Sequence, residues 1–221
     1  MSRTMDDNFA IAAKGGNGGT ITYSSSLESV AMVDSDTGAV TMVGVGDTVI
    51  TATVAATVNY EQQVVLYNLK VTKGEGTPLT VDISDVSRTM DDNFAQAAKG
   101  GNGGTITYSS SLESVAMVDS DTGAVTMVGV GDTVITATEA ATVNYEQQVV
   151  LYNLKVTKGE GTPLTVDISD VSRTMDDNFA QAAKGGNGGT ITYSSSLESV
   201  AMVDSDTGAV TMVGVGDTGA L

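Results

Sequence analysis

The fold is decided by the stretch Val65-Leu66-Tyr67-Asn68-Leu69-Lys70-Val71, in which every second residue from Val65 is apolar and faces one side of an extended chain. Leu79-Thr80-Val81-Asp82-Ile83 repeats this alternation, and Val49-Ile50-Thr51-Ala52-Thr53 is rich in β-branched residues, which favour strands. Turn-forming stretches such as Asp34-Ser35-Asp36-Thr37-Gly38 separate the runs. The sequence therefore predicts an all-β fold.

The whole pattern is repeated along the chain. The stretch that begins at Met5 begins again at Met90 and at Met175, which gives a period of 85 residues. Such a period exceeds the roughly 20–45 residues of a solenoid turn and fits one small domain per repeat. We therefore expect a tandem array of β-sandwich domains of about seven strands each. The expected strands lie near residues 79–86, 9–13, 20–24, 30–33, 39–43, 48–54 and 63–72, shifted by 85 in the other copies.

Linkers between the domains are marked by composition. The stretches 73–78 and 158–163 contain both prolines of the chain, flanked by glycine and charged residues. Cutting the chain there predicts repeat one at residues 2–75, lacking its first strand, and a complete repeat two at 76–160. Repeat three is expected at 161–218, truncated before its last strands, and 219–221 form a tail outside the repeat.

An ordered series of short motifs resembles a known family. The series is Thr22-Tyr23-Ser24-Ser25-Ser26, Val30-Ala31-Met32-Val33-Asp34, Thr37-Gly38-Ala39-Val40-Thr41, Gly44-Val45-Gly46 and Ile50-Thr51-Ala52-Thr53. It resembles the bacterial Ig-like (Big) repeats of invasin- and intimin-type surface proteins. Asn59-Tyr60 and the strand that ends at Thr72 resemble the last strands of those repeats, whereas Tyr23 stands where many members carry Trp.

The resemblance implies tandem Ig-like β-sandwich domains at the cell surface or outside the cell. Members of the family form stalk or adhesin segments, or modules that decorate tails and sheaths. We therefore expect a structural segment, a surface stalk or filament subunit. The alternative is an adhesin module that binds an extracellular protein or glycan through its loops. Because the loops are identical among the copies and the differences lie in strands, the structural interpretation is favoured.

Composition excludes several other classes of function. The chain has no Cys and no His, so it lacks thiolate metal sites and the commonest catalytic base. A formal charge of −17 repels phosphate, which argues against nucleic-acid binding, and the apolar runs are too short for membrane insertion. Residues 1–10 lack the pattern of a signal peptide. We expect no enzyme activity and no cofactor.

One acidic turn carries a candidate metal site. Asp34 and Asp36, repeated as Asp119 and Asp121, offer the carboxylate oxygens that Ca²⁺ prefers. The alternative is a solvated acidic turn, because the twelfth position of a calcium loop holds Val45 instead of Glu. The same Asp-Thr-Gly-Ala motif occurs in aspartic proteases, but here it falls where a hairpin turn is expected.

Only two positions distinguish repeat one from repeat two. Ile11 and Val54 of repeat one are replaced by Gln96 and Glu139. Alternation points both positions inward from facing sheets, so we expect the end of repeat one to be drier than that of repeat two. Ile11 and Val54 are our candidate assembly interface, through which incomplete terminal domains self-associate head to tail by strand addition. The alternative is independent drift at two edge positions.

Overall fold

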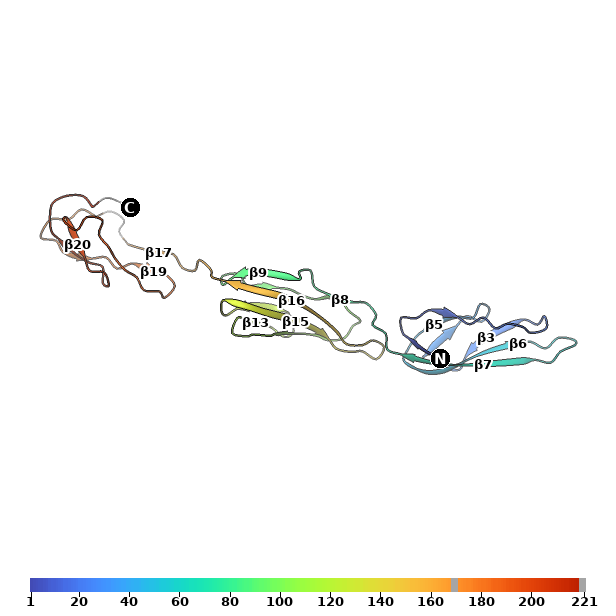
Figure 1. The fold of residues 1–221 in the computed structure, drawn as a ribbon. Coiled ribbons are helices and arrows are strands. Elements are labelled where there is room, and N and C mark those ends of the chain that lie inside the picture. Colours follow the sequence, from blue (N-terminus) through green and yellow to red (C-terminus); the bar gives the residue numbers. More distant parts are fainter. Residues whose placement is uncertain (168–170, 219–221) are drawn as a thin grey trace. The chain divides into compact units, whose positions relative to one another are not determined.

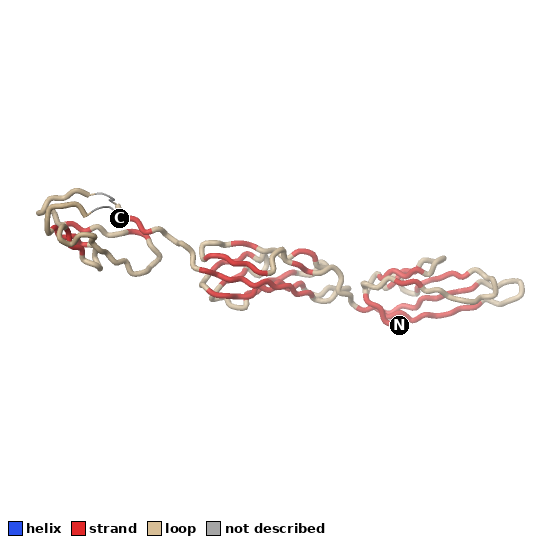
Figure 2. The backbone as a smooth tube through the Cα atoms, turned by 45° about the horizontal axis from the view of Figure 1, so that its top comes forward, coloured by secondary structure: helices blue, strands red, loops and turns tan. Residues whose placement is uncertain are grey.

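The computed structural model describes residues 1–167 and 171–218, and the tail 219–221 lies outside them. Strands, turns and loops make up the whole of this described part, with no helix (Figures 1 and 2). Contacts divide the chain into two compact units, Met1–Thr157 and Lys158–Leu221. The first unit contains repeats one and two, and the second contains repeat three.

Repeat one is a sandwich of two sheets. Its larger sheet has the order β1-β7-β6-β3, formed by Ser2–Thr4, Gln63–Thr72, Gly46–Val54 and Ile21–Ser25. The smaller sheet has the order β2-β5-β4, formed by Phe9–Ala10, Ala39–Met42 and Ala31–Val33. Val40 and Met42 of the small sheet pack in one buried cluster with Ile50, Leu69 and Val71 of the large one. The alternation seen in the sequence therefore places these side chains between the sheets.

Repeat two has the same two sheets and an added pair of strands. Its large sheet, β12-β15-β16-β9, comprises Ile106–Ser110, Gly131–Glu139, Gln148–Thr157 and Asp85–Thr89. Its small sheet, β10-β14-β13, comprises Phe94–Ala95, Ala124–Met127 and Ala116–Val118. The added pair joins β8 (Leu79–Thr80) to β11 (Lys99–Gly100). Residues 14 and 15, the counterparts of β11, form no strand because repeat one has no counterpart of β8 to pair with them.

Repeat three keeps only the small sheet and the added pair. The small sheet, β18-β21-β20, comprises Phe179–Ala180, Ala209–Met212 and Ala201–Val203, and β17 (Leu164–Thr165) pairs with β19 (Lys184–Gly185). Residues 191–195 and 171–174 form no strand, although their counterparts in repeat two pair with β15 and β16. Their partners have no counterpart in repeat three, whose sequence departs from the repeat after Thr218.

The expected first strand differs from the structure. The sequence predicts one strand over 79–86, but β8 ends at Thr80 and β9 runs from Asp85 to Thr89. Residues 87–89 of β9 lie beyond the expected range, and their counterpart in repeat one is β1, which pairs in parallel with β7 from Ser2↔Lys70 to Thr4↔Thr72. Residues 168–170, within the corresponding strand expected at 164–171, lie outside the described part of the chain.

Tyrosine takes the position where many family members carry Trp. Tyr23 and Tyr108 are buried, and each hydroxyl oxygen accepts a hydrogen bond from a loop amide, that of Ala13 at 3.1 Å and that of Ala98 at 2.9 Å. The phenol therefore fills the core and also fixes the loop that follows the first strand of the small sheet.

Candidate functional sites

The acidic turn between β4 and β5 is held by its own aspartate. One oxygen of Asp34, Oδ1, accepts hydrogen bonds from the Thr37 hydroxyl at 2.7 Å, the Thr37 amide at 2.8 Å and the Asp36 amide at 3.2 Å. The hydrogen bonds from Thr37 lower the pKa of Asp34. Asp119 and Asp204 make the same bonds in the other repeats. This carboxylate therefore stabilises a tight turn.

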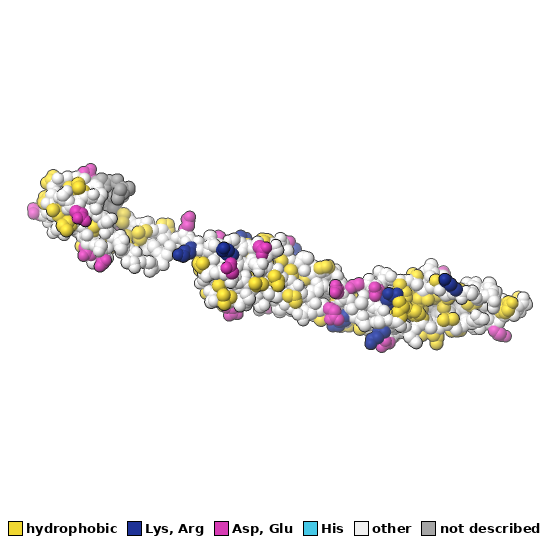
Figure 3. Space-filling view, in the orientation of Figure 1, with side chains coloured by type: hydrophobic (Ala, Val, Ile, Leu, Met, Phe, Trp, Pro, Cys, Tyr) yellow, Lys and Arg dark blue, Asp and Glu magenta, His cyan; other side chains and the backbone are white. Residues whose placement is uncertain are grey.

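Each acidic turn offers two carboxylates, such as Asp34 and Asp36, as possible calcium ligands. The Oδ1 atom of Asp36 accepts a hydrogen bond from the Ser35 hydroxyl, and Asp121 does the same with Ser120. Within residues 1–167 and 171–218, no group of three or more Asp or Glu side chains could hold a metal ion. On the face drawn in Figure 3, acidic side chains are scattered along the surface instead of forming one patch.

The two substituted positions face inward, as the alternation indicated. Gln96 is 8% exposed and Glu139 is 2% exposed, whereas Ile11 and Val54 are only half-buried. This reverses the expectation that the end of repeat one is drier. Val54 ends β6 of the large sheet, and Ile11 follows β2 of the small sheet and packs against the core of repeat one.

Glu139 is buried because a glycine loop receives its carboxylate. Its Oε1 atom accepts the amides of Asn102 at 2.6 Å and Gly104 at 2.9 Å, and its Oε2 atom is buried without a hydrogen-bond partner. Gly101 has a φ of +80°, and a Cβ there would lie 2.5 Å from Oε2, so only glycine fits this position. In repeat one, Val54 stands in place of Glu139 and offers no carboxylate. The amide of Gly19, the counterpart of Gly104, donates instead to the Gly16 carbonyl at 2.9 Å.

A short strand that directly follows the linker, β8, covers this end of repeat two. Leu79 of β8 is 6% exposed and packs in a buried cluster with Tyr108 and Ala137. Gln148 holds the strand in place: its Oε1 atom accepts the Leu79 amide at 2.5 Å, and its Nε2 atom donates to the Thr77 carbonyl at 3.0 Å. Repeat one has no such strand, and so its end is more exposed.

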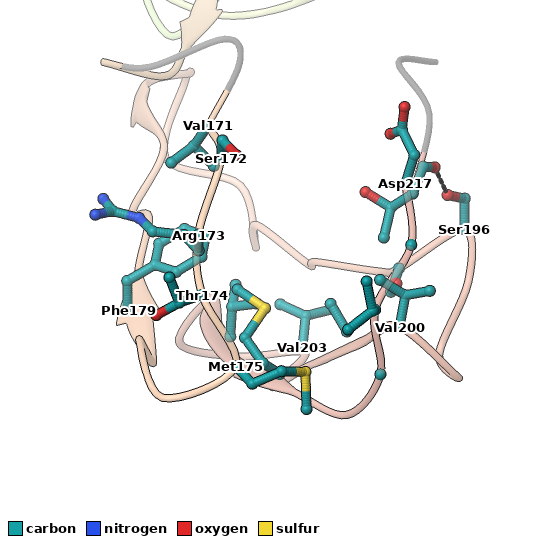
Figure 4. Close-up of a pocket in the computed structure, with 18 of the residues that line it drawn as sticks. Val171, Ser172, Arg173, Thr174, Met175, Phe179, Ser196, Val200, Val203 and Asp217 are labelled. Carbon is teal, nitrogen blue, oxygen red and sulfur yellow. Dashed lines mark hydrogen bonds between the residues drawn. The ribbon is translucent and has the colours of Figure 1, made fainter.

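Repeat three contains an open cleft of about 860 Å³. Met175 and Val203 lie at its floor, with Arg173 on one side and Ser196 and Asp217 on the other (Figure 4). The corresponding space in repeat two is filled by the inward side chains of β15 and β16, namely Ile135, Tyr152, Leu154 and Val156. The cleft therefore lies where β15 and β16 pack in repeat two, and its lining is mixed, with Ser196 and Asp217 as well as Met175 and Val203.

Hydrogen bonds join repeats one and two directly and through the linker. Asn144, in the loop between β15 and β16, accepts the Val45 amide through Oδ1 at 3.2 Å and donates through Nδ2 to the Val43 carbonyl at 3.3 Å. Gly74 in the linker donates its amide to the Asn144 carbonyl at 3.0 Å, and its carbonyl accepts the Glu146 amide at 2.9 Å. A loop of repeat two thus binds both a loop of repeat one and the linker.

Side chains of both repeats also hold the rest of the linker. Asp6 of repeat one accepts the amides of Glu75 at 2.7 Å and Gly76 at 3.1 Å. Asn102 of repeat two accepts the Thr77 amide at 2.7 Å and donates to the Glu75 carbonyl at 3.0 Å. Although the linker is rich in glycine, most of its backbone groups have partners, which opposes the flexibility expected of such a sequence.

Comparison with known proteins identifies the repeats. The family model described as the intimin, immunoglobulin-like domain matches residues 7–57 and 91–141. Each matched segment lies within one repeat, so repeats one and two are similar to this Ig-like domain. The resemblance seen in the sequence is thereby confirmed, and so is the all-β fold of tandem Ig-like sandwiches. No curated protein matches the chain.

Solved structures similar to these Ig-like repeats are themselves multi-domain segments. Mouse cadherin-23 EC22-24 is 16% identical over 92% of this chain and 78% of its own, with a TM-score of 0.35. Human CDH23 EC21-23 is 14% identical over 96% of this chain and 91% of its own, with a TM-score of 0.37. The S-layer protein rSbsC(31-844) is 19% identical over 71% of this chain and 22% of its own, with a TM-score of 0.36.

No helix in the described part of the chain is long and apolar enough to cross a membrane.

Sequence reasoning missed the hydrogen-bond partners of two side chains of the Ig-like repeats, Glu139 and Asn144. Glu139 was recognised as a substitution, but its glycine-loop partners lie 37 and 35 residues away in the chain. Asn144 acts on Val43 and Val45, about 100 residues earlier and in another repeat. For Glu139, the signal in the sequence is a carboxylate at an inward strand position in a repeat that also contains a Gly-Gly-Asn-Gly-Gly run, since successive glycine amides bind anions.

Proposed function

We propose that the chain is a structural segment of a surface stalk or filament, in which Ig-like repeats keep other parts of an assembly at a fixed spacing. The observation that carries this proposal is the bonded junction between repeats one and two. A spacer requires that neighbouring domains resist bending, and the contacts of Asn144, Asp6 and Asn102 tie loop, linker and domain together. The intimin-type family match supports a location at the cell surface or outside the cell.

Self-association is the second part of the proposal. The open cleft of repeat three has room for two strands, and the end of repeat one exposes Val65 at 63%, although its counterpart Val150 is half-buried. Ile11 and Val54 lie at this same end. Apolar surface in repeat one and in repeat three supports a head-to-tail contact between chains, which is heterologous and builds an open filament.

Distances between labels test the spacer function. Because the chain has no cysteine, cysteines placed at exposed Glu28 and Glu113 carry the only two spin labels, one in each repeat of the first unit. We expect one narrow distance distribution in the parent protein and a broader one in Asn144→Ala. Asn59→Ala is the matched control, because Asn59 is the same residue in repeat one and makes no contact in this junction. A distribution equally broad in all three proteins contradicts the spacer.

The rival function, an adhesin, gives a different result. Saturable binding of the chain to a glycan or matrix protein, removed by substitutions in the loops, would replace the spacer interpretation.

A further inference from the structure

Asn102 lies where the linker meets repeat two, and both polar atoms of its carboxamide bind the linker. Its Oδ1 atom accepts the Thr77 amide at 2.7 Å, and its Nδ2 atom donates to the Glu75 carbonyl at 3.0 Å. Asn187 holds the next linker by the same two hydrogen bonds, at 2.7 and 3.0 Å. Because one atom accepts and the other donates, only an intact amide satisfies both groups of the linker.

Asn102 is followed by a glycine whose backbone nitrogen is accessible. Gly103 is exposed, and a Cβ built on it would meet no atom within 4 Å, so the space around it is open. Glu139 accepts the amides on either side, those of Asn102 and Gly104, whereas the Gly103 amide has no hydrogen-bond acceptor among the described residues. This nitrogen can therefore attack a neighbouring carbonyl carbon without first losing a hydrogen bond.

We propose that Asn102 is a deamidation site and that its deamidation loosens the junction between repeats one and two. The Gly103 nitrogen bonds to Cγ of Asn102, the bond from Cγ to Nδ2 breaks, and ammonia leaves with the proton of the Gly103 amide. Water then opens the resulting succinimide ring at either of its carbonyl groups, which gives aspartate or isoaspartate. Each asparagine thus consumes a water molecule and releases an ammonia. The proposal rests on the spacer function, because it names a reaction that alters the junction of the spacer.

The linker contact determines when this reaction occurs. The carboxamide must turn away from Thr77 and Glu75 toward Gly103, so its hydrogen bonds to the linker break first. The rate in the folded protein therefore follows the fraction of molecules in which the linker is transiently released. Gln148 opposes this release, since its Nε2 atom donates to the carbonyls of Glu75 and Thr77, to which Asn102 also donates.

The product cannot bind the linker as asparagine does. A carboxylate oxygen replaces the Nδ2 donor and faces the Glu75 carbonyl oxygen, so an acceptor meets an acceptor. The new charge also arises in the loop that encloses the buried carboxylate of Glu139, which repels it. Isoaspartate in addition lengthens the backbone by a methylene and displaces the Gly104 amide from Glu139. A transient release of the linker therefore becomes a lasting loosening of the junction.

Mass spectrometry of the full chain after incubation at mildly alkaline pH measures the reaction. Trypsin releases residues 15–70 and 100–155 as separate peptides, which differ in mass because Val54 in the first is Glu139 in the second. Fragmentation locates the replacement of NH₂ by OH at Asn102. We expect this replacement to accumulate in the folded protein, more slowly than in urea, where no linker contact remains.

A matched pair of variants tests the role of the linker contact. Gln148→Ala speeds deamidation of Asn102 in the folded protein, because it removes a second donor from the same linker carbonyls. Gln63→Ala is the control: Gln63 is the same residue in repeat one, makes no hydrogen bond to this linker, and its loss leaves the rate at Asn102 unchanged. Equal rates at Asn102 in folded parent protein and in urea would contradict protection by the linker.

Label distances between positions 28 and 113 test the effect on the junction. We expect Asn102→Asp, and parent protein aged until Asn102 has reacted, to give a broader distribution than fresh parent protein. Asn17→Asp is the matched control, because it places the same charge in the corresponding loop of repeat one, which does not hold this linker.

Two further results overturn the proposal. If Asn102 reacts in urea but never in folded parent protein or folded Gln148→Ala, it is no modification site of the folded chain. If Asn102→Asp and aged protein both keep the narrow distribution of fresh parent protein, deamidation does not loosen the junction. Failure of the spacer function looks different, since fresh parent protein then already has a distribution as broad as that of Asn144→Ala.

Discussion

Repeats one and two have almost the same sequence, yet the same end of each is built differently. In repeat two, Leu79 closes the end, and Gln96 and Glu139 are almost fully buried. In repeat one, Ile11 and Val54 occupy the positions of the two polar residues and are more exposed. The apolar pair thus occurs in the repeat that lacks a strand equivalent to β8, and the polar pair occurs in the repeat that has β8. The burial of this end is decided by β8, the strand that follows the linker, and not by the polarity of the residues at positions 96 and 139.

The inward face of the last strand shows the same contrast. Tyr152 is 1% exposed and Val150 is half-buried, whereas Tyr67 is half-buried and Val65 is 63% exposed. Since all these residues are identical in type between the repeats, the difference comes from what lies over them. A repeat is therefore completed by residues that belong, in sequence, to the boundary with its neighbour.

Removing the cover is expected to have the largest effect. Leu79→Ala lowers the free energy of unfolding of repeat two by about 2–5 kcal/mol, because Leu79 is 6% exposed and its loss leaves a cavity beside Tyr108 and Ala137. Leu164→Ala is the matched control: the same residue of β17 is 55% exposed, so a change within about 0.5 kcal/mol is expected. Denaturant unfolding measures both. Equal losses in the two variants would show that β8 does not cover the end of repeat two.

The next largest effect is expected at high pH, where ionisation of Tyr152 lowers the stability of repeat two. Burial raises the pKa of Tyr152 to about 12, above its ordinary value of 10.0. The resulting stability is fully present below pH 10 and is lost as the pH rises toward 12, by about 3 kcal/mol. Tyr152→Phe removes this loss and also the buried hydroxyl that has no partner. Thermal unfolding of both proteins from pH 8 to 12 is the measurement, and parallel curves would contradict the assigned burial.

Converting repeat two toward repeat one has a smaller effect. Glu139→Val leaves the amides of Asn102 and Gly104 without their acceptor, which costs about 1–3 kcal/mol. Glu139→Gln is the control, because it keeps an acceptor oxygen of the same reach and loses less. Denaturant unfolding combined with hydrogen exchange at these two amides follows both changes. Unchanged protection in Glu139→Val would mean that the loop does not depend on the carboxylate.

The acidic turn gives the smallest effect and should be the same in all repeats. The hydrogen bonds of Thr37 hold the pKa of Asp34 below its ordinary value, so this carboxylate stabilises the fold above that value and ceases to do so as the pH falls through the lowered pKa. Asp34→Ala therefore has a lower Tm at neutral pH, and the difference shrinks in acid. Calcium leaves the Tm of both proteins unchanged. A rise in Tm that Asp34→Ala abolishes would establish the metal site instead.

The sequence predicts the sandwich well because period-two alternation determines which side chains face the core. Val40, Ile50, Leu69 and Val71 are all buried as the alternation requires. The alternation could not predict that the first strand is divided into β8 and β9. β9 is defined by its parallel pairing with β16, from Asn153↔Asp85 to Thr157↔Thr89, and these strands lie almost a whole repeat apart in the sequence. The reach of Asn144 was equally hidden, since its partners belong to another repeat.

The parallel pairing of first and last strands determines how a repeat bears mechanical load. In repeat two, β9 enters the domain and β16 leaves it, side by side and in the same direction. Tension applied through the two ends of the repeat pulls these neighbours in opposite directions along their length, so their shared hydrogen bonds are sheared together instead of opened one after another. Five register pairs share this load in repeat two and three in repeat one. Under tension, the register pairs between β9 and β16 of repeat two therefore resist together.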